Sequence, residues 1–495
     1  MKLLKLINLI FFIGLSNETP LDDYVNTPDP HFKYDLINSY ELPGYKLYIL
    51  NMTSQKWQDE NIVERPIWWH YITVSVPDKI SRQDASFMWI GGSANRDTIP
   101  KPTDGDVQLV SNFSLITGTI SAVVQQIPNQ PYIFNNDPDR IPRTEDSIIA
   151  WTWKLFIQNT SNPTILLRFP MTKAVVRAMD TVEDFALKNF NFKIKKFMNA
   201  GKSKRGWTTW TTAAVDYKRV FAAAPIVMDL ANLNSNFHNH FKSLGGWTFE
   251  FYDYYMQGIL NSIDTRELFE MEKLIDPLSY FDRYKNTQIL VMNAANDEFF
   301  LPDDTYAYWD SLVAATDGTV LNRRFDNVGH SLDGKQNQIL ETLSGLFVST
   351  YENRLKPRLR WSRPNNSTHG ILRAFIDSNN ILPFEFKCFY AYTLKDGRRD
   401  FRRAEADPDN PSKEILHPVK WIPTKENIKV SQDSHSTIYE IAFERPEKYY
   451  LGFYLEFSFK GVNGMNNIVN TEVSIIPETF PSDDCSRTTC NGKVV

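Results

Sequence analysis

Cysteine is scarce in this chain, with only three among 495 residues. So few cysteines exclude a disulfide-stapled scaffold, and their scattered positions do not give the ligand spacing of a zinc site. Cys485 and Cys490 are close enough in sequence to close a small loop in an oxidising compartment. Cys388 lies in the apolar run 384–392, and we expect it to be a buried free thiol.

Long apolar runs and a charge excess are also absent. No wholly apolar run is long enough to cross a bilayer, so we expect no membrane span. The net charge of −5 and the pI near 6.0 give no indication of a nucleic-acid partner. Apolar residues make up 42% of the chain, including 33 Phe, 22 Tyr and 12 Trp, which is enough for large cores. The length suggests two domains, or one large domain with an appendage.

The N-terminus predicts secretion. Residues 1–5 are short and basic, residues 6–15 are largely apolar, and Ser16 is a small residue near a plausible cleavage point. We therefore predict a signal peptide over residues 1–18; the alternative is the hydrophobic start of a cytosolic domain, which the polar sequence that follows disfavours. N-glycosylation sequons agree with secretion. They lie at Asn51, Asn112, Asn159, Asn365 and Asn366.

Strand-like and helix-like segments alternate through the first two thirds of the chain, which is typical of a parallel sheet with crossover helices. The predicted strands are 68–76, 85–90, 118–127, 220–227 and 288–293. The predicted helices are 146–157, 171–187 with Thr172 as a cap, and 336–351. Residues 229–282 interrupt this alternation with aromatic-rich helical spacing. They would lie at the carboxyl ends of the strands, where ligands bind; we predict a helical lid, with additional core helices as the alternative.

A serine between glycines stands where a predicted strand meets a predicted helix, in Gly201-Lys-Ser-Lys-Arg-Gly206. Such a sharp turn is how α/β-hydrolases expose a nucleophile, and the helix N-terminus behind it favours developing negative charge. The general pattern has glycine two residues after the serine, whereas here that residue is Arg205. A large side chain is compatible with the turn if it points outward. The alternative for Ser203 is a helix cap on an ordinary turn.

Positive charge surrounds this serine. Lys202, Lys204 and Arg205 could attract an anionic substrate group, or they could form a solvated basic turn. We favour the solvated turn.

The residues that follow later strands complete the pattern of a serine hydrolase. Asp297 comes just after the strand 288–293, and His330 just after the run 323–328. The order Ser, Asp, His is that of α/β-hydrolases. We predict that His330 takes the proton of Ser203 and that Asp297 orients the imidazole. A structural histidine and a polar loop are the alternatives.

Other residues could share these roles. Asp303 or Asp304 could replace Asp297. Backbone N–H groups of Lys204, Gly92 and Ser93 are predicted to form the oxyanion hole. No metal or cofactor is expected, because the pair His238 and His240 has no acidic or cysteine companions at ligand spacing.

After residue 355 the pattern changes to short alternating runs separated by Pro, Asn, Gly and Asp, which is typical of a β-sandwich. We therefore predict an α/β-hydrolase-like domain over 19–355, with a mostly parallel sheet and the lid 229–282 inserted, followed by a β-sandwich domain with a C-terminal tail over 356–495.

Several segments together give a resemblance to a known family. The chain resembles the PhoPQ-activated pathogenicity-related family over roughly residues 21–335. The segments are 21–30, 128–131, 146–153, 170–173, 201–210 and 293–302. The elbow of that family is itself Ser-Lys-Arg-Gly, so Arg205 fits it. The resemblance implies an α/β-hydrolase-like fold and carries a presumed triad onto Ser203, Asp297 and His330.

Two main functional hypotheses follow. The signal peptide and sequons resemble those of a secreted eukaryotic family member, which implies an extracellular signal that represses proliferation through a cell-surface receptor or another secreted protein. The alternative is a secreted serine hydrolase that cleaves a peptide or ester substrate through an acyl-enzyme. A third possibility is carbohydrate or matrix binding by the β-sandwich.

Overall fold

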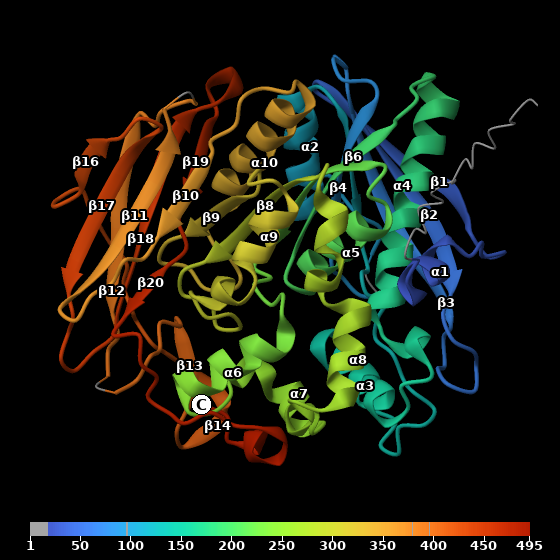
Figure 1. The fold of residues 1–495 in the computed structure, drawn as a ribbon. Coiled ribbons are helices and arrows are strands. Elements are labelled where there is room, and N and C mark those ends of the chain that lie inside the picture. The colour runs from blue at the N-terminus through green and yellow to red at the C-terminus, as the bar shows by residue number, and fades with distance from the viewer. Residues whose placement is uncertain (1–17, 96–97, 379, 396) are drawn as a thin grey trace, which may run out of the picture.

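A computed structural model describes residues 18–95, 98–378, 380–395 and 397–495 (Figure 1). The predicted signal peptide lies outside these residues, apart from its last position. In these ranges no helix combines the length and the apolar character that a membrane span needs. The chain forms a large sheet with helices on both faces, followed by smaller antiparallel sheets.

Among the described residues, the large sheet has nine strands in the order β1-β2-β3-β5-β4-β6-β7-β8-β9. Strands β1, β2 and β3 pair antiparallel with their neighbours, and the other six are parallel to one another. The central strands are almost wholly buried, which explains their continuous apolar runs. The strands are β1 (Lys33–Leu42), β2 (Tyr45–Lys56), β3 (Ile67–Pro77), β4 (Ala85–Ile90), β5 (Ile120–Val124), β6 (Lys196–Lys202), β7 (Val220–Ile226), β8 (Gln288–Ala294) and β9 (Leu321–Phe325).

The strand order reverses its direction once within the sheet. From β4 the chain crosses to β5 on one side and later to β6 on the other, so the direction of winding reverses at β4. In open α/β sheets, ligands bind beyond the carboxyl ends of the strands at such a reversal. Gly92 follows β4 and Ser203 follows β6, so both lie at this edge.

Helices cover both faces of the sheet (Figure 1). On one face, α2 (Gly105–Thr117) and α10 (Gln336–Tyr351) meet through Phe113 and Phe347, whose ring centroids are 5.4 Å apart. On the other face, α4 (Arg168–Phe190) packs on α5 (Lys204–Val215). Three further helices belong to this part of the chain. They are α1 (Pro20–Asn26), α3 (Glu145–Gln158) and α9 (Trp309–Ala315).

The predicted cap of α4 is wrong. The helix begins at Arg168, and Thr172 lies one turn inside it, where its hydroxyl donates to the Arg168 carbonyl at 2.8 Å. Pro170 falls in the first turn, where a missing N–H is tolerated, so it does not stop the helix.

Between β7 and β8 lies a helical segment that contains α6 (Leu233–Leu244), α7 (Tyr252–Met256) and α8 (Arg266–Ile275), joined by 3-10 turns. In Figure 1 these helices lie together at one end of the large sheet. Phe237, Phe251 and Tyr254 of this segment line a cavity that also contains Ser203. The segment therefore covers the carboxyl-end edge of the sheet.

The C-terminal part is a β-sandwich. Its first sheet has the order β10-β11-β17-β16 and its second the order β15-β12-β18-β19, with β20 also paired to β18. Their facing sides meet through Tyr439, whose ring centroid lies 4.8 Å from that of Phe386 and 5.0 Å from that of Phe457. The strands are β10 (Leu359–Ser362), β11 (His369–Asp377), β12 (Glu385–Tyr392), β15 (Ile422–Thr424), β16 (Lys429–Gln432), β17 (Ser436–Glu444), β18 (Leu451–Lys460), β19 (Asn466–Asn470) and β20 (Ser474–Ile476), with a separate hairpin of β13 (Ala404–Asp407) and β14 (Asn410–Leu416). We propose residue 355, between α10 and β10, as the domain boundary.

Buried polar contacts join the two parts. Arg323 of β9 forms an ion pair with Glu456 of β18 at 2.7 Å, and both side chains are about 95% buried (5% and 6% exposed). The backbone N–H of Arg324 donates to the Asn470 side chain at 2.8 Å. These contacts fix the sandwich against the edge strand β9.

The C-terminal tail returns to the helical segment. Cys485 and Cys490 form a disulfide. The N–H of Trp247 donates to the Lys493 carbonyl at 2.8 Å, and the Trp247 indole N–H donates to the Cys490 carbonyl at 2.7 Å. The third cysteine, Cys388, is a buried free thiol whose pKa is raised by burial.

Candidate active site

Ser203 occupies a strained turn between β6 and α5. Its backbone has φ 56° and ψ −129°, a conformation that residues with a side chain rarely adopt. Close packing explains the flanking glycines. A Cβ at position 201 would lie 2.8 Å from the Arg205 carbonyl oxygen, and one at 206 would lie 2.9 Å from that of Ile226. The turn therefore has the geometry of a nucleophile elbow, with its second glycine displaced by one residue.

The change Gly201→Ala is expected to destabilise the protein by about 1–3 kcal/mol, because the added methyl group overpacks the elbow. Urea unfolding measures the effect. Gly105→Ala is the matched control, since a Cβ at Gly105 meets no atom within 4 Å. Equal unfolding midpoints for the two variants would contradict the proposed packing.

Arg205 points away from the turn. Its Nε donates to the Ile127 carbonyl at 2.5 Å, and its Nη2 forms an ion pair with Glu145 at 2.6 Å. The guanidinium lies across Gly92, where a Cβ would meet Nη2 at 2.9 Å. An outward side chain thus makes this large residue compatible with the elbow.

The prediction of a solvated basic turn is wrong for Lys204 and Arg205. Lys204 is only 8% exposed, and its Nζ lies 2.9 Å from Glu145 and 2.8 Å from Asp146. Burial opposes ionisation of Glu145, but Arg205 and Lys204 outweigh it and hold its pKa well below the usual range. These two carboxylates balance the charges of Lys204 and Arg205. Lys202 donates to the Ser331 carbonyl at 3.2 Å.

Asp297 and His330 lie together at the ends of β8 and β9. The His330 Nδ1 is 2.9 and 3.0 Å from the two carboxylate oxygens of Asp297. A carboxylate only accepts, so Nδ1 carries the hydrogen and Nε2 is the accepting nitrogen of the neutral ring. The N–H groups of Phe299 and Phe300 donate to Asp297 at 2.8 and 3.1 Å and fix the carboxylate. This is the orientation that a general base needs.

The two alternative carboxylates are engaged elsewhere. Asp303 forms an ion pair with Arg399. Asp304 accepts from the Leu301 N–H at 2.7 Å and from the Asn239 side chain at 2.9 Å. The structure therefore brings Asp297, of the three, to His330.

Ser203 and His330 are not hydrogen-bonded to each other. The His330 Nε2 is buried and has no hydrogen-bond partner in the described part of the chain. Catalytic hydrogen bonds are often long without substrate and shorten in the complex. Phe299 lies near both residues. It lines the cavity of Ser203, and its ring centroid lies 4.5 Å from that of His330.

Acid is expected to remove any hydrolysis that depends on Ser203. Burial lowers the pKa of His330, but the Asp297 carboxylate outweighs it, so the net shift is upward from 6.5. A base must be neutral, so kcat/KM should rise with pH through a midpoint above 6.5. Glu250 also favours the charged ring, and burial raises its own pKa to about 7.

A second test of this pH dependence is Glu250→Gln, which removes one negative neighbour of His330. We expect the midpoint of the pH profile to fall while the profile keeps its shape. A midpoint below 6.5 in the unmodified protein would contradict the assignment of His330 as the base.

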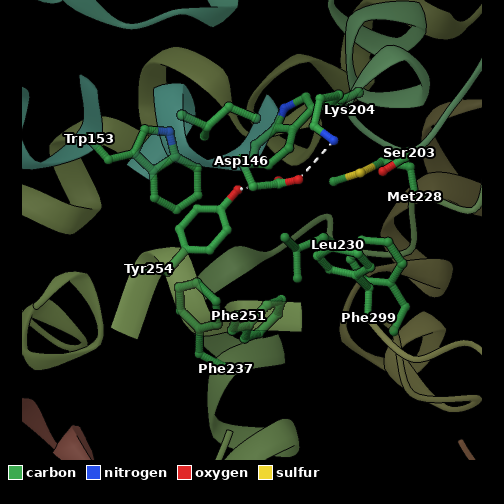
Figure 2. Close-up of a pocket in the computed structure, with 13 residues that line it drawn as sticks. Asp146, Trp153, Ser203, Lys204, Met228, Leu230, Phe237, Phe251, Tyr254 and Phe299 are labelled. Atoms are coloured by element: carbon green, nitrogen blue, oxygen red, sulfur yellow. Dashed lines mark hydrogen bonds and ion pairs between the residues drawn. The ribbon is translucent and has the colours of Figure 1, made fainter. Parts of the chain in front are cut away.

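The cavity beside Ser203 is small and aromatic. Its volume is about 30 Å³. Figure 2 shows Ser203 and Lys204 on one side and Phe237 and Phe251 on the opposite side. The Lys204–Asp146 ion pair forms its polar end, where the Tyr254 hydroxyl also donates to Asp146 at 2.9 Å.

The predicted oxyanion donors lie at the carboxyl-end edge of the sheet, as Ser203 does. Lys204 is the first residue of α5, so no intrahelical bond uses its N–H. Gly92 packs against Arg205, and Ser93 has a positive φ of 97°. The Gly92 carbonyl accepts from the Gln126 N–H at 2.6 Å, which fixes the loop after β4.

Sequence reasoning gave no role to three residues of this site, namely Glu145, Asp146 and Arg168. Arg168 is 3% exposed, and its Nη1 donates to the Lys204 carbonyl at 2.6 Å. Burial lowers the pKa of Arg168 to about 9. The available signal was their position in or beside segments 146–153 and 170–173 of the family resemblance.

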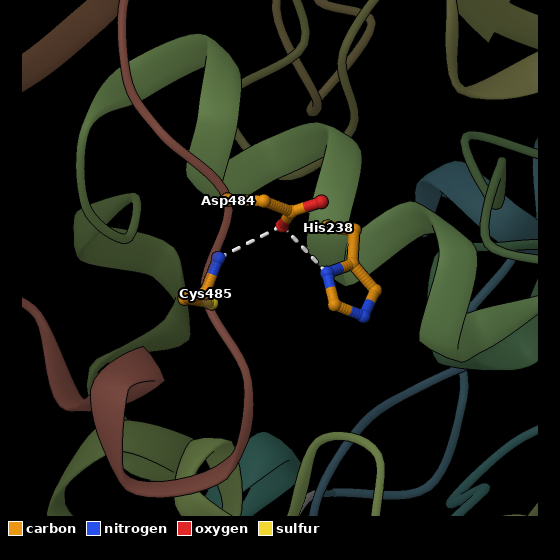
Figure 3. Close-up of side chains that lie close together, drawn as sticks. All are labelled: His238, Asp484 and Cys485. Atoms are coloured by element: carbon orange, nitrogen blue, oxygen red, sulfur yellow. Dashed lines mark hydrogen bonds and ion pairs between the residues drawn. The ribbon is translucent and has the colours of Figure 1, made fainter.

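The histidine pair on α6 has structural contacts. His238 bridges Asp484 at 2.7 Å and Asp264 at 3.0 Å, as Figure 3 shows for Asp484. Cys485, which follows Asp484 in the chain, is held in the disulfide and is no thiolate ligand. His240 points elsewhere and accepts from the Thr248 N–H at 3.1 Å.

A second group of possible metal ligands consists of Asp400, Glu405 and His417. Cationic side chains surround it. Asp400 pairs with Arg402, and Glu405 pairs with Lys395 and Arg398. These ion pairs explain the buried carboxylates without a metal ion.

Four of the five sequon asparagines are exposed, namely Asn51, Asn112, Asn159 and Asn366. The prediction for Asn365 conflicts with the structure. Its Nδ2, the atom that would carry a glycan, is buried. Its Oδ1 accepts from the Ile371 N–H at 2.7 Å, so the side chain is held inside the turn.

The sheet order, the elbow and the carboxylate-bound histidine define a protein of the α/β-hydrolase fold. Residues 21–402 match the family described as PhoPQ-activated pathogenicity-related protein. The chain belongs to this family, as the sequence resemblance indicated.

One relative covers nearly the whole chain. It is "Autocrine proliferation repressor protein A" of Dictyostelium discoideum, 33% identical over 98% of this chain and 96% of the relative. Solved structures show a more distant likeness. An acetyl xylan esterase from Paenibacillus sp. R4 has 15% identity and a TM-score of 0.43, with 66% of this chain and 95% of that one covered. An S-formylglutathione hydrolase from Agrobacterium tumefaciens has 12% identity and a TM-score of 0.40, with 64% and 99% covered.

Proposed function

We propose that this chain is a secreted serine hydrolase that works through an acyl-enzyme at Ser203. The observation that carries the proposal is the strained, positive-φ serine beside a histidine that a buried carboxylate orients. His330 Nε2 takes the Ser203 proton as Oγ attacks the acyl carbonyl. The leaving group then takes that proton and departs, and water releases the acyl group by the same route.

The oxyanion that forms in this reaction needs backbone donors. We assign this role to the N–H groups of Lys204 and of the Gly92–Ser93 loop. Arg168 positions Lys204 by binding its carbonyl. The positive end of the α5 dipole also faces the developing charge.

A fluorophosphonate probe tests the chemistry, because it reacts with activated serines. The folded protein should be labelled, and Ser203→Ala should abolish the labelling. Ser235→Ala, on an exposed position of α6, is the matched control and should keep it. Absence of labelling in the folded, unmodified protein would remove the hydrolase proposal.

A second function is favoured by the relative that spans the chain. We propose an extracellular signal that represses proliferation of the secreting cells, glycosylated at Asn51, Asn112, Asn159 and Asn366 and received by a surface receptor or another secreted protein. The 33% identity over 98% of the chain supports this proposal.

Purified protein added to cells tests the signal. Cell counts should fall relative to buffer. Growth repression by Ser203→Ala protein would mean that the signal does not need the hydrolase chemistry. Unchanged growth with both proteins would contradict the signalling proposal.

A further inference from the structure

The aromatic cavity beside Ser203 limits what can bind there. Its volume is about 30 Å³, which is room for about two or three atoms of the size of a water molecule. Its walls are packed in the core, since Trp153, Trp207 and Phe237 are each 3% exposed and Phe251 is 4% exposed. Close-packed interiors do not expand without cost. A long chain therefore does not fit this cavity.

The polar end of the cavity offers no free charge. The Asp146 carboxylate is bound by Lys204 and by the Tyr254 hydroxyl, at 2.8 and 2.9 Å. An anionic group would meet a cation that is already neutralised. The occupant that fits is small and uncharged.

A second cavity lies on the His330 side. It is lined by His330 and by Glu250, Glu298 and Arg403, among others, and has a volume of about 570 Å³. In acyl transfer the leaving group receives its proton from the histidine, so it must lie beside His330. The wide cavity, which has charged side chains in its wall, therefore suits the leaving group. The small cavity, lined by Ser203 but not by His330, suits the acyl group.

We propose that the aromatic cavity is the acyl subsite of a short-chain esterase, which takes acetyl- or propionyl-sized groups from esters of polar alcohols. The inference rests on the proposed chemistry of Ser203. The small cavity favours an ester substrate over a peptide, because the acyl side of a peptide carries a side chain and a further stretch of backbone.

The helical segment sets the size limit. Leu230 and Phe237 line the cavity from the segment after β7. Shortening Leu230 to Ala adds room for a longer acyl chain without touching Ser203, Asp297 or His330. Phe269, on α8 of the same segment, is 42% exposed and does not line the cavity, so Phe269→Ala is a matched control.

The experiment compares 4-nitrophenyl acetate, propionate, butyrate and octanoate, with Ser203→Ala subtracted as background. We expect kcat/KM of the unmodified protein to fall about tenfold or more from propionate to butyrate and about 100-fold or more to octanoate. Leu230→Ala should raise the butyrate-to-acetate ratio about tenfold, and Phe269→Ala should leave it unchanged. A ratio of two substrates is independent of the folded fraction.

If the protein hydrolysed the octanoate ester as fast as the acetate ester, the proposed subsite would be wrong, even with Ser203-dependent activity intact. An unchanged ratio in both Leu230→Ala and Phe237→Ala would also overturn it. Absence of Ser203-dependent hydrolysis of every ester would instead overturn the proposed function, and the subsite with it.

Discussion

Replacing Asp297 with Asn is expected to lower kcat/KM for Ser203-dependent ester hydrolysis about 10⁴-fold. The carboxylate accepts the Nδ1 hydrogen of His330 and leaves Nε2 as the base. An amide in its place presents an N–H that favours the opposite tautomer. Steady-state rates with 4-nitrophenyl acetate measure the loss.

The control for this substitution is Asp333→Asn, which removes the same charge from an exposed residue lining the His330 cavity. We expect little change in its rate. If Asp297→Asn kept most of its activity while Ser203→Ala lost it, another group would have to orient His330.

Replacing Glu456 with Gln is expected to destabilise the protein by about 3–5 kcal/mol. The change leaves the Arg323 guanidinium buried without its carboxylate at the junction of β9 and β18. Glu456 also pairs with Lys387 at 3.1 Å, so two cations lose a partner. Urea unfolding measures the free energy.

An exposed ion pair is the control for this effect. Glu385 pairs with Lys425 at 2.9 Å, with side chains 43% and 64% exposed. Such pairs contribute about 0–1 kcal/mol, so Glu385→Gln should change the free energy of unfolding by that much at most. Similar losses in both variants would show that the junction is not the sensitive contact.

The sheet and its catalytic ends could be predicted because their signals are local. The segments predicted over 220–227 and 288–293 coincide with β7 and β8 within one residue. Central parallel strands are buried on both faces and give continuous apolar runs. Asp297 and His330 follow adjacent strands, so topology alone brought them to one edge.

The environment of the elbow could not be predicted, because it depends on distant segments. Lys204 and Arg205 look like a solvated turn in sequence, and their partner Glu145 lies about 60 residues earlier, at the start of α3. Whether the Ser203 hydroxyl reaches His330 Nε2 depends on side-chain packing, and in this structure that nitrogen has no partner among the described residues. Pattern and spacing carry no information at that scale.

The alternating runs after residue 355 predicted the sandwich, but not how it attaches. Arg323 and Glu456 look like ordinary polar residues in their strands. Their pairing depends on the alignment of two sheet edges, which no local pattern encodes.

That attachment makes the β-sandwich unsuitable for removal as a test of its role. A chain ending near residue 355 would lose Glu456, and with it the counter-charge of Arg323. It would also lose Arg399, the partner of Asp303, and the tail that packs on Trp247. A loss of function in the truncated product would therefore not separate damage to the remaining fold from lost recognition. Point changes on strand β16, whose four residues are all exposed, leave these contacts intact and are the better probe of that surface.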